Sequence, residues 1–247
     1  MGRIPFVNGN HLEAAFGPPT FMRIVLCYPI EPRHYQQICA AAAGHEVIDA
    51  GQERIATELL AADVFCGHAK VPVSWPEVVR QGRLKWIQSS AAGLDHCLVP
   101  ETIASDIIVT SASGLFAEQV AEQTLALTLG LLRGLPTFFR AQQKREFMRR
   151  PTGDLSHKTV GIVGLGGNGT RIAEVLRPFH TRVIATDIFT SEQPGCVDVL
   201  WPAEQLDRLL AESDIVILCA PLNEQTQGMI AAPQFNRMKR GALLINV

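Results

Sequence analysis

The sequence predicts an α/β protein that contains two doubly wound parallel sheets, each with helices on both faces. Short apolar segments alternate with helical stretches along most of the 247 residues, which is the rhythm of β-α-β units. A glycine-rich turn at residues 164–169 separates a predicted strand from a predicted helix. The composition, 47% hydrophobic and 19% charged, is typical of a globular protein that buries a sizeable core.

The first predicted domain covers residues 21–113, after an N-terminal extension at residues 1–20. The extension contains no continuous apolar segment, so it does not resemble a secretory signal. Within the domain, strand candidates are separated by segments long enough for crossover helices or loops. The predicted strands are residues 23–27, 46–48, 63–66, 84–89 and 107–110, and a helix is predicted at residues 32–43.

The second predicted domain covers residues 114–247 and follows a hinge-like segment at residues 111–114. Two of its predicted helices, 118–133 and 170–179, carry apolar side chains at the spacing of a single helix face. Those side chains are Ala121, Leu125, Leu129 and Leu132 in the first helix, and Ile172, Val175, Leu176 and Phe179 in the second. The predicted strands are residues 159–163, 182–187, 214–219 and 242–247.

The charge and cysteine patterns exclude several classes of function. A net charge of −2 favours neither nucleic acid nor an anionic membrane as partner, and the basic segment at residues 140–150 is read as a solvated helix face. The longest apolar stretch, residues 125–132, is much shorter than the roughly 20 residues that a bilayer demands. The six cysteines show no C-x-x-C pair and no zinc spacing with histidine, so we expect a reduced, cytoplasmic protein without a metal site.

The turn Gly164-Leu165-Gly166-Gly167-Asn168-Gly169 matches the G-x-G-x-x-G fingerprint of dinucleotide binding. The first glycine allows a tight turn, the second lets backbone approach the pyrophosphate, and the third permits close packing of helix on strand. Free N–H groups at the start of the next helix then face the phosphates. The alternative is an ordinary strand-to-helix turn. In the dinucleotide interpretation, Gly164, Gly166, Gly167, Asn168 and Gly169 bind the cofactor.

Asp187 lies 18 residues beyond Gly169, at the end of the next predicted strand. A carboxylate there accepts hydrogen bonds from the ribose hydroxyls and repels a 2′-phosphate, which predicts NAD rather than NADP. The alternative is a plain acid at a strand end. Further cofactor contacts are expected beyond the carboxyl ends of later strands. The residues predicted for those contacts are Cys219, Ala220, Pro221, Thr226, Asn246 and Val247.

Five motifs in order resemble the NAD-dependent, D-isomer-specific 2-hydroxyacid dehydrogenase family. They are residues 84–95 (LKWIQSSAAGLD), 120–122 (VAE), 161–166 (GIVGLG), 219–226 (CAPLNEQT) and 238–247 (MKRGALLINV). The resemblance implies a flavodoxin-like substrate domain followed by a Rossmann dinucleotide-binding domain, the second one incomplete. It also implies a homodimer and a small 2-hydroxy or 2-keto acid as substrate.

The same resemblance implies a loop whose backbone N–H groups hold the substrate carboxylate, at Ala91, Ala92 and Gly93. Taken alone, without the resemblance, these residues are better explained as a turn at the end of a strand. Lys70 and His68 lie near the end of another strand and would add charge to the same site, although surface positions explain them as well. Phe116 stands where many members of the family carry an asparagine, which changes a polar substrate contact.

Hydride transfer in the family uses an arginine to bind the keto acid and a histidine paired with a glutamate as acid and base. None of the seven histidines stands at the family position, so these catalytic residues are expected beyond Val247, in a C-terminally truncated chain. The function expected for the intact protein is therefore NAD-dependent oxidation of a D-2-hydroxy acid, or reduction of the keto acid. The alternative is a non-catalytic NAD(H)-binding module or pseudoenzyme that resembles a corepressor.

Overall fold

The computed structural model describes residues 21–247, and the N-terminal extension predicted at residues 1–20 lies outside the described residues. The described chain divides after Ser113 into two compact units. Residues 21–113 are called the N-terminal unit, and Gly114–Val247 the C-terminal unit. Both are α/β units with one parallel sheet, so the predicted fold class is confirmed.

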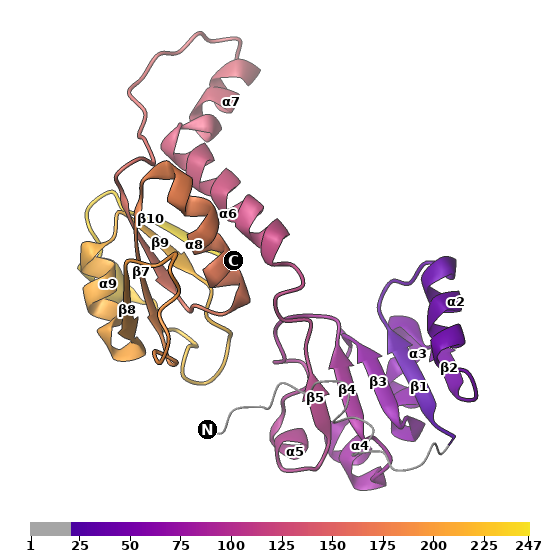
Figure 1. The fold of residues 1–247 in the computed structure, drawn as a ribbon. Coiled ribbons are helices and arrows are strands. Elements are labelled where there is room, and N and C mark those ends of the chain that lie inside the picture. Colours follow the sequence, from indigo (N-terminus) through magenta and orange to yellow (C-terminus); the bar gives the residue numbers. More distant parts are fainter. Residues whose placement is uncertain (1–20) are drawn as a thin grey trace. The chain divides into compact units, whose positions relative to one another are not determined.

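The N-terminal unit contains a parallel sheet with the strand order β2-β1-β3-β4-β5 (Figure 1). This is the flavodoxin-like order, in which the first strand lies beside the second and the third. Its core includes Phe65, Ile55 and Ile87, each fully buried. The strands are β1 (Arg23–Cys27), β2 (Glu46–Asp49), β3 (Val64–Gly67), β4 (Trp86–Ser89) and β5 (Ile108–Thr110). The helices are α2 (Pro32–Ala41), α3 (Gly51–Glu58), α4 (Trp75–Gln81) and α5 (Pro100–Ile103), with a short 3-10 turn at Leu59–Ala61.

The C-terminal unit contains a parallel sheet with the order β10-β9-β6-β7-β8. Numbered within the unit, this is 5-4-1-2-3, which corresponds to the Rossmann strand order. The strands are β6 (Thr159–Val163), β7 (Arg182–Asp187), β8 (Val199–Pro202), β9 (Ile215–Leu218) and β10 (Leu243–Asn246). The helices are α6 (Ala117–Leu132), α7 (Leu135–Gln143), α8 (Gly167–Leu176), α9 (Leu206–Glu212) and α10 (Ala232–Arg237), with 3-10 turns at Arg177–Phe179 and Ala203–Gln205.

Alternate residues of the central strands build two separate cores on the two faces of this sheet. Val160 and Ile162 face the core that α6 and α8 cover, whereas Val163 lies in the core beneath α9. This alternation is the period of a strand that is buried on both sides. The apolar faces predicted for the helices at 118–133 and 170–179 pack into the first of these cores. No helix within residues 21–247 is long and apolar enough to cross a membrane.

Two helix predictions need correction. The helix predicted from Thr170 starts three residues earlier, because Gly166 is extended and the glycine turn itself supplies the first helical residues. The basic segment at 140–150 is helical only to Gln143, and Arg145 adopts a positive φ of 57° that ends helical geometry. Its residues from 142 to 150 are exposed, so a solvated surface is correct and a continuous helix is not.

An aspartate that precedes a strand pins the start of the neighbouring strand at three places. Asp63 Oδ2 accepts the N–H of Arg23 at 2.8 Å, Asp214 Oδ2 that of Thr159 at 2.9 Å, and Asp198 Oδ2 that of Val183 at 2.7 Å. Burial by itself raises the pKa of Asp214, but hydrogen bonds from the Thr159 N–H and the Lys239 ammonium lower it below its ordinary value overall. These contacts satisfy backbone donors at the amino edges of both sheets and fix the register there.

Candidate functional site

The glycine turn joins β6 to α8 and is held by backbone from both neighbouring strands. The Gly164 N–H donates to the Thr186 carbonyl at 2.8 Å, and the Cys219 N–H donates to the Val163 carbonyl at 2.8 Å. Gly164 has a φ of +92°, and an ideal Cβ there would lie 2.7 Å from the Ala220 nitrogen. Only glycine fits this conformation and this close approach.

Space at the start of α8 differs sharply between two glycines of the turn. A Cβ at Gly169 would lie 2.2 Å from the Gly164 carbonyl oxygen, so this residue is required by packing. A Cβ at Gly166 would meet nothing within 4 Å, so packing among the described residues does not require glycine at this position. The N–H groups of Gly167, Asn168 and Gly169 follow in the first turn of α8, where helices leave amides without an intrahelical partner. Open space in front of such amides fits a phosphate group.

Asp187 ends β7 and contacts the glycine turn directly. Its Oδ2 accepts the N–H of Leu165 at 2.6 Å, and its Oδ1 accepts the N–H of Phe189 at 2.8 Å. Sequence spacing predicted a carboxylate beside the turn, but it did not predict that this carboxylate also holds the turn. Asp187 is only half-buried, so lone pairs of both oxygens can still accept hydrogen bonds from ribose hydroxyls.

The segment after β9 forms a small closed loop at the same edge of the sheet. Thr226 Oγ1 donates to the Pro221 carbonyl at 2.6 Å, and Asn223 Oδ1 accepts the N–H groups of Gln225 and Thr226. Cys219 lies at the base of this loop, and burial raises the pKa of its thiol to about 12. The thiol is therefore protonated at neutral pH and acts here as a small apolar contact.

All of the predicted cofactor residues gather at the carboxyl edge of the C-terminal sheet. The strands are parallel, so the ends of β6, β7, β9 and β10 lie along one edge (Figure 1). Asn246 pairs with Leu218, and the Val247 N–H donates to the Leu218 carbonyl at 3.1 Å. The strand order reverses between β6 and β9, which is where open α/β sheets bind ligands.

In the N-terminal unit, the loop predicted to bind a carboxylate follows β4. Ser89 Oγ accepts the Ala91 N–H at 3.0 Å and donates to the Ala91 carbonyl at 3.2 Å. This side chain fixes the start of the loop, and it already accepts a hydrogen bond from Ala91, one of the three predicted amides. The N–H groups of Ala92 and Gly93 have no hydrogen-bond acceptor among residues 21–247, and both residues are exposed. The loop thus presents two backbone donors to solvent.

A pocket of about 520 Å³ opens beside this loop, at the carboxyl ends of β1, β3 and β4. It brings Lys70 and Ala91, which the sequence had singled out, together with residues that the sequence reasoning had missed. The missed residues that matter here are Tyr28, Asp49, Gln52 and Ser90. Asp49 ends β2, and the other three residues follow strand ends closely, so the rule that ligands bind at and beyond strand ends would have found them once the strand boundaries were correct.

His68 lines the same pocket, and its ring stacks on that of His96 with the centroids 4.0 Å apart. Both ring nitrogens of His96 are buried and have no hydrogen-bond partner among the described residues. Burial lowers the pKa of His96, His68 lowers it further, and Asp95 opposes the two. The His96 ring is therefore neutral at neutral pH, and it packs face to face against the His68 ring.

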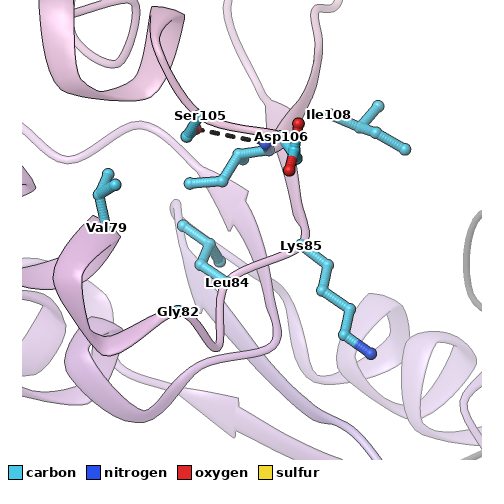
Figure 2. A pocket seen from close by; sticks show the side chains of 8 residues that line it. Val79, Gly82, Leu84, Lys85, Ser105, Asp106 and Ile108 are labelled. Carbon is cyan, nitrogen blue, oxygen red and sulfur yellow. Dashed lines mark hydrogen bonds between the residues drawn. The ribbon is translucent and has the colours of Figure 1, made fainter.

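A second pocket, of about 500 Å³, lies near the opposite ends of β4 and β5 (Figure 2). Val79 and Leu84 supply apolar side chains, and Lys85 extends away from them. The Ser105 hydroxyl accepts the Ile107 N–H at 3.3 Å, which closes the turn before β5. This pocket lies away from the carboxyl edge and contains none of the predicted site residues. Within residues 21–247, no group of three or more His, Cys, Asp or Glu side chains could hold a metal ion.

Comparison with known proteins decides the family. The model of the NAD-binding domain of D-isomer specific 2-hydroxyacid dehydrogenases matches residues 125–247, which is most of the C-terminal unit. A glyoxylate reductase from Thermofilum pendens is 33% identical over 174 residues. A D-specific alpha-keto acid dehydrogenase from Enterococcus faecium is 32% identical over 189 residues. The chain belongs to the D-isomer-specific 2-hydroxyacid dehydrogenase family.

Solved structures support the same fold for this chain. A D-lactate dehydrogenase from Aquifex aeolicus, in complex with NAD and lactic acid, matches with a TM-score of 0.76 and 25% identity over 90% of this chain and 68% of that one. A Xanthobacter autotrophicus 2-hydroxyacid dehydrogenase, solved with NADPH and MES, matches with a TM-score of 0.73 and 24% identity over 92% of this chain and 72% of that one. The predicted nicotinamide dinucleotide cofactor is confirmed.

The chain spans only part of the length of its curated relatives. The matches cover 66% of this chain and 50% of the glyoxylate reductase, and 74% of this chain and 55% of the keto acid dehydrogenase. It therefore spans about half the length of these two relatives.

Proposed function

We propose that the whole protein is an NAD-dependent oxidoreductase that interconverts a small D-2-hydroxy acid and its 2-keto acid. Oxidation of the alcohol removes a hydride from the carbon that bears the hydroxyl and a proton from the hydroxyl oxygen. NAD, when bound, supplies the hydride acceptor, and NADH the donor in the reverse direction.

The glycine turn held by Asp187 supports this proposal most directly. The turn combines free helix amides, open space at Gly166 and a carboxylate bonded to the Leu165 N–H. Gly164, Gly166, Gly167, Asn168 and Gly169 would hold the pyrophosphate, and Asp187 the adenosine ribose. The cofactor is proposed to be NAD rather than NADP because Asp187 would repel a 2′-phosphate.

The later cofactor contacts are proposed at the same edge of the C-terminal sheet. The nicotinamide half would contact Cys219, Ala220, Pro221, Thr226, Asn246 and Val247. In the N-terminal unit, the substrate carboxylate would be held by the loop Ala91, Ala92 and Gly93 and by the Lys70 ammonium. The two exposed N–H groups of Ala92 and Gly93 and the lysine charge are suited to an anion.

The whole protein is expected to oxidise NADH when a suitable keto acid is added. The assay is the loss of NADH absorbance with glyoxylate, hydroxypyruvate, pyruvate or phenylpyruvate, each compared with acetate, which has a carboxylate and no keto group. Turnover with at least one keto acid and none with acetate is the expected result. Calorimetric NADH binding with no turnover on any of them would instead favour a non-catalytic NAD(H)-binding module.

We also propose that the protein is a homodimer joined through the helices α6 and α7. Large apolar side chains spaced four residues apart are exposed there: Leu127 (41%) and Leu131 (45%) on α6, and Leu135 (42%) and Phe139 (57%) on α7. Residues four apart share a helix face, so each pair forms part of a stripe. Exposed apolar stripes of this kind favour a protein partner over water.

The double variant Leu131→Arg, Phe139→Arg is expected to be a monomer. In the dimer, its two added charges would be buried against the partner without compensating charges. Sedimentation velocity measures the change in mass. The control is Gln36→Arg, which adds the same charge to an exposed position of α2 in the other unit. A parent protein that sediments as a monomer would contradict the proposal, as would a double variant that remains dimeric.

A cytoplasmic location is proposed from the state of the cysteines. All six are free thiols, and burial raises the pKa of Cys66 to about 11 and that of Cys97 to about 12. Buried thiols of this kind stay protonated and unreactive at neutral pH, and free thiols are the usual state of cysteine in reducing compartments.

A further inference from the structure

The segment of residues 68–70 is held by a side chain from a different element. Gln52, the second residue of α3, donates from Nε2 to the His68 carbonyl at 2.9 Å. Its Oε1 accepts the Lys70 N–H at 2.8 Å. One amide side chain thus satisfies the backbone groups on both sides of Ala69. Neither the glycine turn nor the carboxylate loop involves this residue.

The two hydrogen bonds reproduce the pattern of a parallel β-ladder. In such a ladder, one residue donates its N–H to, and accepts with its C=O from, the two residues that flank a single residue of the neighbouring strand. β3 ends at Gly67, and the amide of Gln52 continues its pairing for one more step, past the end of the sheet. The backbone around Ala69, which is 8% exposed, is therefore as well fixed as a strand residue.

The side chains of this segment are held to different degrees. The His68 N–H donates to the Cys27 carbonyl at 2.9 Å, and the His68 ring is stacked on His96. Lys70 is exposed, and its ammonium has no ion-pair or hydrogen-bond partner among residues 21–247. Lys70 lines the 520 Å³ pocket from this fixed backbone, with Asp49 as the acidic residue of the lining. A cation that no neighbouring group neutralises, carried on a backbone that is held in place, is suited to contact an anion.

We infer that Gln52 is a positioning residue for substrate recognition: by holding the backbone of residues 68–70, it fixes the point from which Lys70 reaches the carboxylate of the substrate. The inference rests on the proposed function. Gln52 does not touch the reacting atoms, and it acts through Lys70. Loss of its amide leaves the Lys70 N–H and the His68 carbonyl without these partners, and the lysine then samples positions outside the pocket.

The test is a double-mutant cycle in the whole protein, with glyoxylate as the keto acid. Gln52→Met keeps the length of the side chain and removes both hydrogen bonds, and it is expected to raise KM for glyoxylate about tenfold with kcat changed less than about threefold. In a Lys70→Met background, the same change is expected to raise KM less than about twofold. Gln36→Met, at an exposed position of α2, is the matched control and should change neither parameter.

A purely structural role would give equal factors in both backgrounds, and that result would overturn the inference. An independent measurement is the hydrogen-exchange rate of the Lys70 amide, which is expected to rise about tenfold in Gln52→Met. An unchanged exchange rate would also overturn the inference. If the parent protein turns over no keto acid, the proposed function fails by itself, and the exchange rate still decides whether Gln52 holds this segment.

Discussion

Gly166→Val is expected to abolish measurable NADH binding while the protein stays folded. The backbone at Gly166 has a φ of −73°, which valine adopts without strain, and a Cβ there meets no atom within 4 Å. The branched side chain would occupy the space in front of the α8 amides. A dinucleotide then loses its closest backbone contact, and its Kd should rise more than about 100-fold, or about 2.7 kcal/mol.

Calorimetry with NADH and a thermal unfolding curve measure the two parts of this expectation. Gly195→Val is the matched control, because that position is equally open and lies elsewhere in the same unit. Gly169→Ala should behave in the opposite way: its Cβ would lie 2.2 Å from the Gly164 carbonyl oxygen, so the fold itself should be destabilised. If Gly166→Val bound NADH as tightly as the parent, the turn would not be the pyrophosphate site.

Asp187→Ala is expected to shift coenzyme preference from NADH toward NADPH by about 100-fold in the ratio of dissociation constants. The carboxylate offers charged hydrogen bonds to the ribose hydroxyls, each worth about 1.5–3 kcal/mol, and it repels a 2′-phosphate. Removing the carboxylate weakens the binding of NADH and relieves the repulsion of the 2′-phosphate of NADPH. The Leu165 and Phe189 N–H groups also lose their acceptor. The affinity for both coenzymes is therefore expected to fall somewhat as well.

The ratio of the NADH and NADPH dissociation constants separates the loss of the carboxylate from the loosening of the turn. A loosened turn weakens the binding of both coenzymes alike and leaves the ratio unchanged. Fluorescence titration with each reduced coenzyme gives the ratio. Glu192→Ala is the control: it removes one exposed acid from the segment after β7 and has no contact with the glycine turn. An Asp187→Ala protein that retains the parental ratio would refute the assignment of Asp187 to the ribose.

The sheets could be predicted from the sequence because the pattern along their strands is local. β1, β6 and β7 match the predicted ranges, since each is an apolar segment bounded by polar or glycine residues. β8, at Val199–Pro202, was missed: it is only partly buried, and it lies at the edge of the sheet. Partial burial weakens the apolar signal on which such predictions depend.

The candidate sites of the two units differed in how far the sequence predicted them. The cofactor turn was recognisable because its glycines stand at a fixed spacing: Gly164 and Gly169 answer steric demands of the turn itself, and Gly166 leaves open space beside it. The start of α8 was misplaced, since glycine has a low helix propensity and only the tertiary structure brings these residues into the helix. The role of Gln52 was not predictable, because it depends on the approach of α3 to a segment 16 residues away.

The aspartates that precede strands bear on which loops of this fold can vary in sequence. Asp63, Asp198 and Asp214 close the amino edges of the two sheets, whereas the amides of Gly167 and Ala92 at the carboxyl edges are left without such side-chain acceptors. The amides that remain free to meet a ligand therefore lie on the rim opposite to these aspartates. Loops on the recognising rim can vary with the substrate while the rim that secures the strands stays constant, and one scaffold can serve relatives that act on different acids.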